Sequence, residues 1–271
     1  DNGYKVYLGD GRQIVSPVDE EIAILIKSVS DVREITQGDT GNVVSDEVLN
    51  SYVALTSQLI ISGPTTEAQR KSVNSVYTAM HGVGTETIQR VFNHAGLATL
   101  ILVDEQCTPD PDFPTIAFPN PEEPGAIDLA LKKARDFGAD LVIANDPDAD
   151  RCAAAINDPK VGWRMLRGDE LGIVFGEWIA RSKPRGSFAN SIVSSSTLRK
   201  ISGHYGIDFQ EVLTGFKWIA KIENLAFGYE EAIGYAVDSD NVNDKDGISA
   251  AIFLAQIAVD LKRDGLTISD L

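Results

Sequence analysis

One stretch of the chain, residues 141–151, most restricts what this protein can fold into. It has the sequence LVIANDPDADR, an apolar run that ends in three carboxylates at alternate positions. The run is short, contains β-branched residues and follows Gly138, which is typical of a buried strand. Pro147 has no backbone N–H and cannot continue a strand or a helix. The stretch therefore predicts an acidic loop at the carboxyl end of a strand, where open α/β sheets bind ligands.

The carboxylates of this loop belong to Asp146, Asp148 and Asp150. Three such charges repel one another unless a cation lies between them, and carboxylate oxygens suit Mg²⁺. Arg151 follows directly, and its guanidinium can hold a phosphate or orient a carboxylate. A calcium loop of the EF-hand type is excluded, because no Glu stands at its last ligand position. A solvated acidic turn is the alternative, but the strand before the loop and the arginine after it favour a magnesium site.

Composition limits the class of protein. With 271 residues, 43% of them hydrophobic, the chain can form one large or two medium domains. The net charge of −16 argues against nucleic acid or a membrane as partner, whereas a metal and local cations still allow a phosphorylated substrate. Two cysteines make no disulfide framework, and neither a membrane span nor a signal peptide is visible. We therefore expect a cytoplasmic protein.

Strand and helix patterns alternate along the chain. Strands are predicted at residues 4–8, 72–77, 100–103, 141–145, 191–194, 209–213 and 225–229, and helices at 18–29, 45–59, 86–94, 125–137, 168–179 and 248–261. A further short helix is predicted after a cap at Ser196. This alternation predicts an α/β fold of two consecutive domains, each with a mixed or parallel sheet and helices on both faces. A partial N-terminal domain precedes them, and we place the limits at residues 1–44, 45–160 and 161–271.

Three further segments stand out. The Gly-rich loop 80–84 precedes a helix and can bind an anion or serve packing alone, and His81 within it is expected to be structural. Residues 214–217 and 230–234 each follow a predicted strand, and Lys245 lies downstream. Alone, these are a plain turn, a solvated acidic pair and a surface charge. Together with the acidic loop they provide carboxylates for sugar hydroxyls and cations for phosphate, which chemistry on a phosphosugar requires.

In this order the segments resemble the α-D-phosphohexomutase family, the phosphoglucomutases and phosphomannomutases. Residues 146–151 look like its D-x-D-x-D-R magnesium loop and residues 230–234 like its G-E-x-S sugar loop, with Ala232 in place of the usual Ser. Residues 214–217 resemble its T-G-x-K segment, and residues 245–247 resemble its K-D-G segment. Residues 79–82 match the start of the family's second domain.

The resemblance implies reversible phosphoryl transfer between C1 and C6 of a hexose phosphate, with glucose phosphates favoured and mannose phosphates as an alternative. The reaction passes through a phosphoserine enzyme and a bisphosphate such as glucose 1,6-bisphosphate. The implied metal ligands for Mg²⁺ are Asp146, Asp148 and Asp150, the implied catalytic residues are Lys245 and Arg151, and the implied substrate-binding residues are Thr214, Gly215, Lys217, Glu230 and Ala232. A hexose phosphate is the expected partner of a monomer or weak dimer.

The family's phosphoserine loop, T-A-S-H-N-P, has no counterpart in this sequence, and neither has its fourth domain. We therefore expect the middle portion of a four-domain mutase, inactive by itself. Two alternatives stay open. A phosphatase with an aspartate nucleophile would need further acidic and basic motifs at later strand ends. A non-catalytic module that binds Mg²⁺ and a sugar phosphate would need only the loops seen here.

Overall fold

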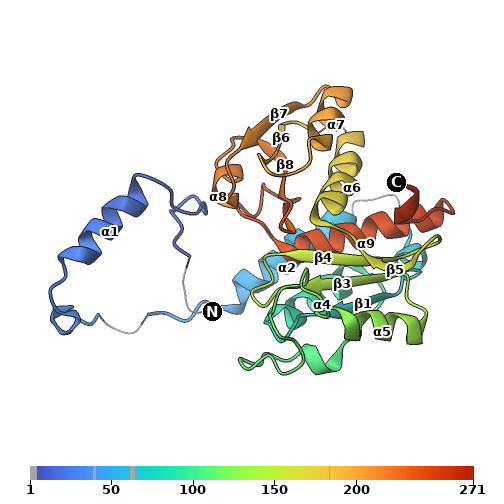
Figure 1. Cartoon of the computed structure of the whole chain (residues 1–271), viewed down its shortest axis with the longest axis horizontal. Coiled ribbons are helices and arrows are strands. Elements are labelled where there is room, and N and C mark those ends of the chain that lie inside the picture. The colour runs from blue at the N-terminus through green and yellow to red at the C-terminus, as the bar shows by residue number, and fades with distance from the viewer. Residues whose placement is uncertain (1–4, 39–40, 62–64, 183) are drawn as a thin grey trace.

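The computed structural model describes residues 5–38, 41–61, 65–182 and 184–271. It is an α/β protein with two mixed sheets, each flanked by helices, and an N-terminal segment that extends away from them (Figure 1). The predicted fold class is confirmed. None of the helices in these ranges is long and apolar enough to cross a membrane.

The first sheet has the strand order β2-β1-β3-β4-β5. Its members are β1 (Ser75–Thr78), β2 (Ile101–Leu102), β3 (Leu141–Asn145), β4 (Cys152–Asp158) and β5 (Gly162–Met165). The first three strands are parallel, and β4 and β5 pair antiparallel. From β1 the chain runs through α4 (Gly84–Ala95) to β2 and returns through α5 (Asp128–Phe137) past β1 to β3. Right-handed crossovers in opposite directions place these two helices on opposite faces of the sheet.

The second sheet repeats this topology, with the strand order β7-β6-β8-β9. Its members are β6 (Ser187–Ser191), β7 (Asp208–Val212), β8 (Leu225–Glu230) and the antiparallel β9 (Gly234–Ala236), with α6 (Gly168–Arg181), α7 (Thr197–Tyr205) and α8 (Phe216–Ile219) around them. A Cβ on Gly172 of α6 would lie 2.6 Å from the Tyr229 ring, and one on Gly228 would lie 2.4 Å from Ile219 of α8. Because Gly228 and Tyr229 point to opposite faces of β8, helices cover both faces.

The repeat makes two hairpin loops equivalent. In each unit the third parallel strand turns back into an antiparallel one, through residues 146–151 in the first unit and residues 231–233 in the second. In each unit the loop also lies beside the strand at which the chain reverses its direction across the sheet, β1 in the first unit and β6 in the second.

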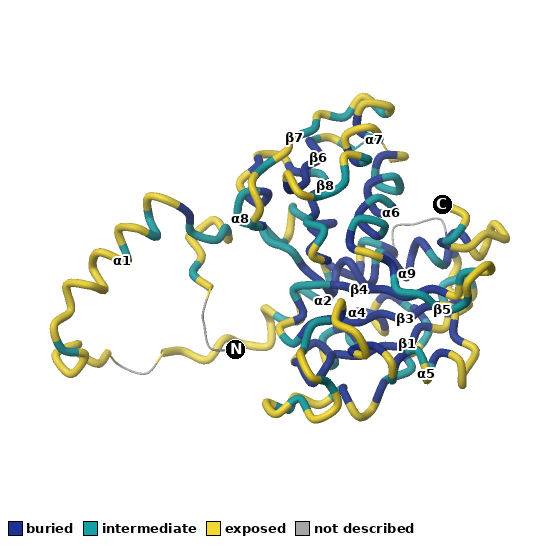
Figure 2. The backbone as a smooth tube through the Cα atoms, in the orientation of Figure 1, coloured by how far each residue is buried: buried dark blue, intermediate teal, exposed yellow. Residues whose placement is uncertain are grey.

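The last long helix joins the units. Helix α9 (Gly247–Arg263) follows the second sheet in sequence but contacts α2 (Asp46–Ile61), α4, β3 and β4 of the first unit. It is apolar nearly all round, which is typical of a buried helix. Phe253 of α9 packs on Phe175 of α6, which packs in turn on Tyr235 of β9, at ring centroid distances of 5.7 and 5.1 Å. One continuous core therefore runs through both sheets (Figure 2).

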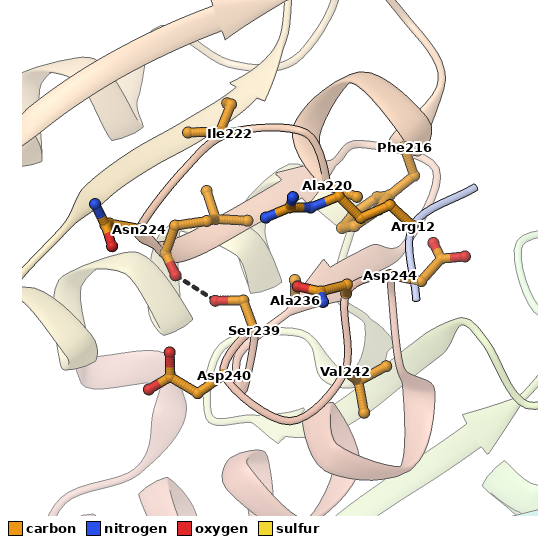
Figure 3. Close-up of a pocket in the computed structure, with 12 residues that line it drawn as sticks. Arg12, Phe216, Ala220, Ile222, Asn224, Ala236, Ser239, Asp240, Val242 and Asp244 are labelled. Carbon is orange, nitrogen blue, oxygen red and sulfur yellow. Dashed lines mark hydrogen bonds between the residues drawn. The ribbon is translucent and has the colours of Figure 1, made fainter. Parts of the chain in front are cut away.

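The N-terminal segment carries the predicted helix, α1 (Val18–Ser28), but none of its residues is buried. Before it, residues 5–15 lie against the second unit. There the Arg12 side chain enters a cavity of about 260 Å³ whose other lining residues all lie between 216 and 244 (Figure 3). The short helices that complete the fold are η1 (Val32–Glu34), α3 (Glu67–Arg70), η2 (Asp104–Gln106) and η3 (Ile268–Asp270).

Several predicted strands need correction. The strand predicted at residues 4–8 is wrong, because Tyr7 makes only an isolated bridge with Gln13, and residue 4 lies outside the described residues. The strand predicted at residues 191–194 is placed too late in the chain, because β6 runs from Ser187 to Ser191 and a turn follows it. The antiparallel strands β4, β5 and β9 were not predicted. The three alanines of β4 have low strand propensity, and its pairing with β3 stabilises it instead. The domain limits stay a prediction.

Candidate active site

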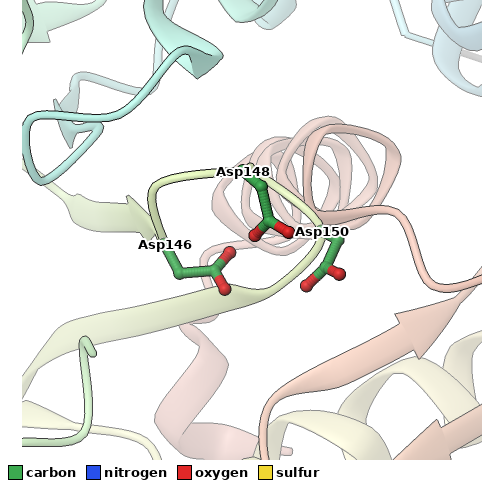
Figure 4. A group of neighbouring side chains, drawn as sticks. All are labelled: Asp146, Asp148 and Asp150. Atoms are coloured by element: carbon green, nitrogen blue, oxygen red, sulfur yellow. The ribbon is translucent and has the colours of Figure 1, made fainter. Parts of the chain in front are cut away.

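The three carboxylates of the acidic loop converge. Asp146, Asp148 and Asp150 each offer an oxygen within 4.8 Å of the other two (Figure 4). Asp146 is buried, Asp150 is half-buried and Asp148 is exposed. Three hard oxygen donors at this separation suit a divalent cation that completes its coordination with water or phosphate.

The loop is held in shape from both ends. Asn145 donates from Nδ2 to the Arg151 carbonyl at 2.7 Å, which ties the start of the hairpin to its end. Ala149 at the tip adopts a φ of 58°, a conformation that costs a non-glycine residue free energy. Gly82 of the Gly-rich loop lies so close that a Cβ there would be 2.3 Å from the Pro147 carbonyl oxygen.

Helix α9 begins against the same loop. Gly247 donates its N–H to the Ala149 carbonyl at 3.1 Å, and a Cβ on Gly247 would lie 2.2 Å from the Arg151 carbonyl oxygen. The preceding Asp246 caps the helix, because its Oδ1 accepts from the Ile248 N–H at 3.0 Å. In the K-D-G segment, aspartate and glycine therefore position the helix, and Lys245 faces the acidic loop.

Three cations pair with the three aspartates. Arg151 Nε donates to Asp146 Oδ2 at 2.6 Å, and Lys245 Nζ donates to Asp150 Oδ2 at 2.5 Å. Lys5 donates to Asp148 Oδ2 at 3.1 Å and also to Asp150. Burial raises the pKa of Asp146 although the Arg151 charge opposes it. Burial would also raise the pKa of Asp148, but the Lys5 ammonium holds it below its usual range.

A cleft of about 1100 Å³ opens over the acidic loop. Its lining residues include seven from the sequence prediction, namely Asp146, Asp148, Asp150, Arg151, Glu230, Ala232 and Lys245. Residues more than 80 positions apart thus share one cleft, because the first unit contributes its acidic loop and the second contributes the end of β8 and the segment before α9.

The two neighbouring glutamates at the end of β8 differ in their surroundings. Glu230 lines the cleft, and its Oε1 accepts from the Gly215 N–H at 2.6 Å. Burial raises the pKa of Glu230 despite this hydrogen bond. Glu231 accepts from the hydroxyls of Ser191 and Ser194 at 2.9 Å each, which fastens this hairpin loop to the loop after β6.

Comparison with protein families decides what the chain is. The model for phosphoglucomutase/phosphomannomutase alpha/beta/alpha domain II matches residues 50–162, and the model for domain III of the same family matches residues 167–271. The chain belongs to the phosphoglucomutase/phosphomannomutase family. The family resemblance of the sequence is thereby confirmed, and the cleft lies between the regions that match domains II and III.

Individual relatives of the chain support the same family. A probable phosphomannomutase of Haemophilus influenzae is 45% identical over 277 residues, which cover 100% of this chain and 56% of the relative. The human phosphopentomutase is 36% identical, with 99% of this chain and 48% of that relative covered. A family structure from Burkholderia thailandensis has a TM-score of 0.72 at 20% identity and covers 89% of this chain and 50% of that one. The chain spans about half the length of the curated relatives it matches.

The segment predicted to correspond to the family's T-G-x-K motif reaches the cleft only in part. Gly215 touches the site through Glu230, whereas Thr214 is exposed and does not line the cleft. Lys217 is also absent from the lining, and its Nζ lies 5.8 Å from the centroid of the Trp218 ring. Substrate contacts of Thr214 and Lys217 therefore stay predictions.

Two loop predictions have mixed outcomes. His81 is buried and pairs through Nε2 with Thr115 Oγ1 at 2.8 Å, which agrees with a structural residue although it also borders the cleft. Anion binding by the Gly-rich loop stays a prediction. Ser196 is the N-cap residue of α7, as predicted, but its side chain makes no capping hydrogen bond. Ser195 Oγ accepts from the Thr197 N–H at 3.2 Å instead.

Other residues of the cleft were not predicted from the sequence. Phe113 and Phe118 lie in a proline-rich loop, residues 109–124, and form part of the cleft wall. Phe118 is 60% exposed. Aromatic residues in a long loop before a helix were the available signal, since such loops are often functional. Lys5 carried no signal, because nothing local in the sequence connects it with residues 143 or more positions away.

Proposed function

We propose that the chain forms the metal-binding and sugar-binding parts of a phosphohexomutase, which moves a phosphoryl group between C1 and C6 of a hexose phosphate. The observation that supports this function is the shared cleft. Asp146, Asp148 and Asp150 reach it from one unit, and Glu230 and Lys245 reach it from the other. A phosphosugar has a phosphate at one end and hydroxyls along its ring, so a cleft with cations and carboxylates at separate places suits it.

The three aspartates would hold Mg²⁺, which when bound neutralises charge on the transferring phosphoryl group. Arg151 and Lys245 line the cleft beside them and would bind phosphoryl oxygens. Glu230 would accept hydrogen bonds from sugar hydroxyls, and the Gly215 N–H orients its carboxylate for this. Lys245 would also donate or accept the proton that a sugar hydroxyl exchanges during transfer.

Calorimetry tests the metal site. We expect the chain to bind Mg²⁺, and Asp148→Asn to bind it at least tenfold more weakly, because one of three ligands loses its charge. Asp19→Asn on the exposed helix α1 is the matched control and should bind like the wild type. Equal affinity of the wild type and Asp148→Asn would remove the basis for a metal role of this loop.

We further propose that the chain alone does not interconvert hexose phosphates. Mutase action requires a group that carries a phosphoryl while the intermediate reorients. No serine, threonine or cysteine lines the cleft within the described part of the chain. The test incubates the chain with glucose 1-phosphate, Mg²⁺ and a trace of glucose 1,6-bisphosphate. Catalysed formation of glucose 6-phosphate would show that the carrier lies within this chain.

The sugar itself needs a direct comparison of substrates. Relatives with 35–45% identity bear the names phosphomannomutase, phosphopentomutase and glucose 1,6-bisphosphate synthase. A pentose phosphate is therefore the second candidate. The cleft position of Ala232 presents a methyl group where the family's sugar loop has a hydroxyl, which removes one polar contact. Assays of a full-length protein with glucose 1-phosphate, mannose 1-phosphate and ribose 1-phosphate decide between the sugars through their kcat/KM values.

The alternative of a phosphatase has less support. An aspartate nucleophile must be free to attack, but Asp146 pairs with Arg151, Asp148 with Lys5, and Asp150 with both lysines. A non-catalytic binding module would bind Mg²⁺ and sugar phosphate equally well. The activity of the full-length protein separates this module from the mutase.

A further inference from the structure

We propose that Lys5 is an internal cation of the acidic loop, which competes with a divalent cation for Asp148 and Asp150. This inference rests on the metal site of the proposed function. The Lys5 ammonium donates to Asp148 Oδ2 at 3.1 Å and to Asp150 Oδ2. These carboxylates are two of the three that converge on the candidate metal position.

The position of Lys5 is not that of a loose chain end. Residues 5–15 fold back on themselves, with the Ile14 N–H donating to the Val6 carbonyl at 3.0 Å. The segment is then fastened to the second unit. Tyr7 OH donates to Asp244 Oδ2 at 2.7 Å, beside Lys245 in sequence.

Two further contacts anchor the segment. Asn243 Nδ2 donates to the Asp10 carbonyl at 2.8 Å, and Arg12 enters the small cavity beside Phe216 (Figure 3). The second unit thus holds an ammonium group against the acidic loop of the first.

Charge explains why this ammonium affects cation binding. The three aspartates carry three negative charges, and Arg151, Lys245 and Lys5 carry three positive ones. The cluster is therefore already neutral, so its net charge no longer attracts a divalent cation unless an ammonium leaves the carboxylates.

Lys5 is the cation that exchanges most readily. Its side chain is 40% exposed, compared with 26% for Arg151 and 17% for Lys245. Arg151 also binds Asp146 through two donors, its backbone N–H and Nε. Water can therefore solvate the Lys5 ammonium at the smallest cost when it leaves the carboxylates.

Isothermal calorimetry with MgCl₂ tests this inference on the chain and three variants. Lys5→Gln removes the competing charge, and we expect it to bind Mg²⁺ about threefold to tenfold more tightly than the wild type. Lys5→Arg keeps the charge and should stay within about twofold of the wild type. Lys27→Gln, on the exposed helix α1, changes the net charge equally and should have no effect. Circular dichroism of each variant checks that the fold is kept.

The outcomes separate this inference from the proposed function. Equal or weaker binding by Lys5→Gln, with Mg²⁺ still bound by the wild type, would overturn the competition and leave the metal site intact. Equal tightening by Lys27→Gln would also overturn it, because the effect would then be one of net charge. Absence of Mg²⁺ binding in the wild type and in Lys5→Gln would overturn both proposals.

A further variant tests the anchor of the N-terminal segment and leaves Lys5 unchanged. Tyr7→Phe removes the hydrogen bond to Asp244, 2.7 Å long, and loosens the segment that holds the ammonium. We expect Mg²⁺ affinity to rise in the same direction as for Lys5→Gln, but by less. In the double variant with Tyr7→Phe and Lys5→Gln, the two effects on Mg²⁺ affinity should be less than additive, because both act through the Lys5 ammonium. Full additivity would contradict the proposed anchor.

Discussion

Gly82 shows how closely two loops approach at the carboxyl end of the first sheet. A Cβ at this position would lie 2.3 Å from both Cα and the carbonyl oxygen of Pro147, and backbone atoms cannot move aside as a flexible side chain does. We expect Gly82→Ala to lower the free energy of unfolding by about 2 kcal/mol or more, measured by urea denaturation. Gly203→Ala is the control, since nothing lies within 4 Å of that Cβ, and helix α7 should gain up to about 1 kcal/mol. Equal effects would mean that the two loops are not packed as described.

The glutamate pair at the end of β8 provides a second prediction for single residues. In a full-length protein, Glu230→Gln should lower kcat/KM by about tenfold to a hundredfold, because the proposed charged acceptor for sugar hydroxyls is lost. Glu231→Gln should lower it much less, because Glu231 binds Ser191 and Ser194. Steady-state kinetics with the preferred sugar phosphate compare the two. A larger loss for Glu231→Gln would show that the sugar contact belongs to Glu231 and not to Glu230.

Among the elements, the two equivalent hairpins share an unusual backbone. Ala149 in the first and Ile233 in the second have φ values of 58° and 57°. Both residues lie in loops that border the cleft, and such conformations persist only where the surroundings enforce them. For Ala149 this support comes from the α9 N-terminus, whose Gly247 N–H binds its carbonyl. The start of α9 therefore helps to hold the acidic loop in this shape.

The cap of α9 predicts a dependence of stability on pH. Burial raises the pKa of Asp246 above the usual value of about 3.9. At pH values between the pKa of Asp246 in the unfolded state and its raised pKa in the native state, the native state binds more protons than the unfolded state. The contribution of Asp246 to stability therefore falls as pH rises through this range. Asp246→Asn keeps a capping oxygen but does not titrate. Its free energy of unfolding relative to wild type should therefore increase between about pH 4 and pH 7, measured by urea denaturation.

Asp246→Ala separates the cap from the charge. It also removes the titrating carboxyl, but it leaves the Ile248 N–H and the Tyr52 hydroxyl without the acceptors they now use. We expect it to be about 1–2 kcal/mol less stable than Asp246→Asn at every pH. A constant difference between Asp246→Asn and wild type across this pH range would show that burial does not perturb this carboxyl.

At the scale of the whole molecule, α9 makes the two units depend on each other. Leu254 of α9 is fully buried in the core that runs through both sheets. Leu254→Ala should lower the free energy of unfolding by about 3–5 kcal/mol, because it leaves a cavity. Hydrogen exchange should accelerate in β3 and in β8 together. Ile24→Ala on α1, where Ile24 is 66% exposed, should stay within about 0.5 kcal/mol of wild type. Faster exchange in one sheet alone would indicate two independent cores.

Short-range patterns in the sequence were sufficient for the fold class and for the acidic loop of the cleft. The stretch 141–151 predicted both a buried strand and converging carboxylates, because a strand, a proline and alternate charges act within a few residues of each other. The order of the later loops indicated the family, which the domain matches confirm. Helices α6 and α9 began within one residue of their predicted starts, since glycine and aspartate punctuate helices locally.

Tertiary structure alone decided how these parts meet. Strand β4, with its three alanines, forms because β3 pairs with it, and α9 crosses to the first sheet because an apolar helix needs a surface to cover. Glu230 lines the same cleft as the acidic loop, and Lys5 reaches Asp148 across 143 positions. No local pattern encodes either arrangement. The sequence by itself therefore determined which chemical groups stand at strand ends. Only long-range packing determined which of them share one cleft, because residues distant in sequence become neighbours only when the sheets and α9 pack together.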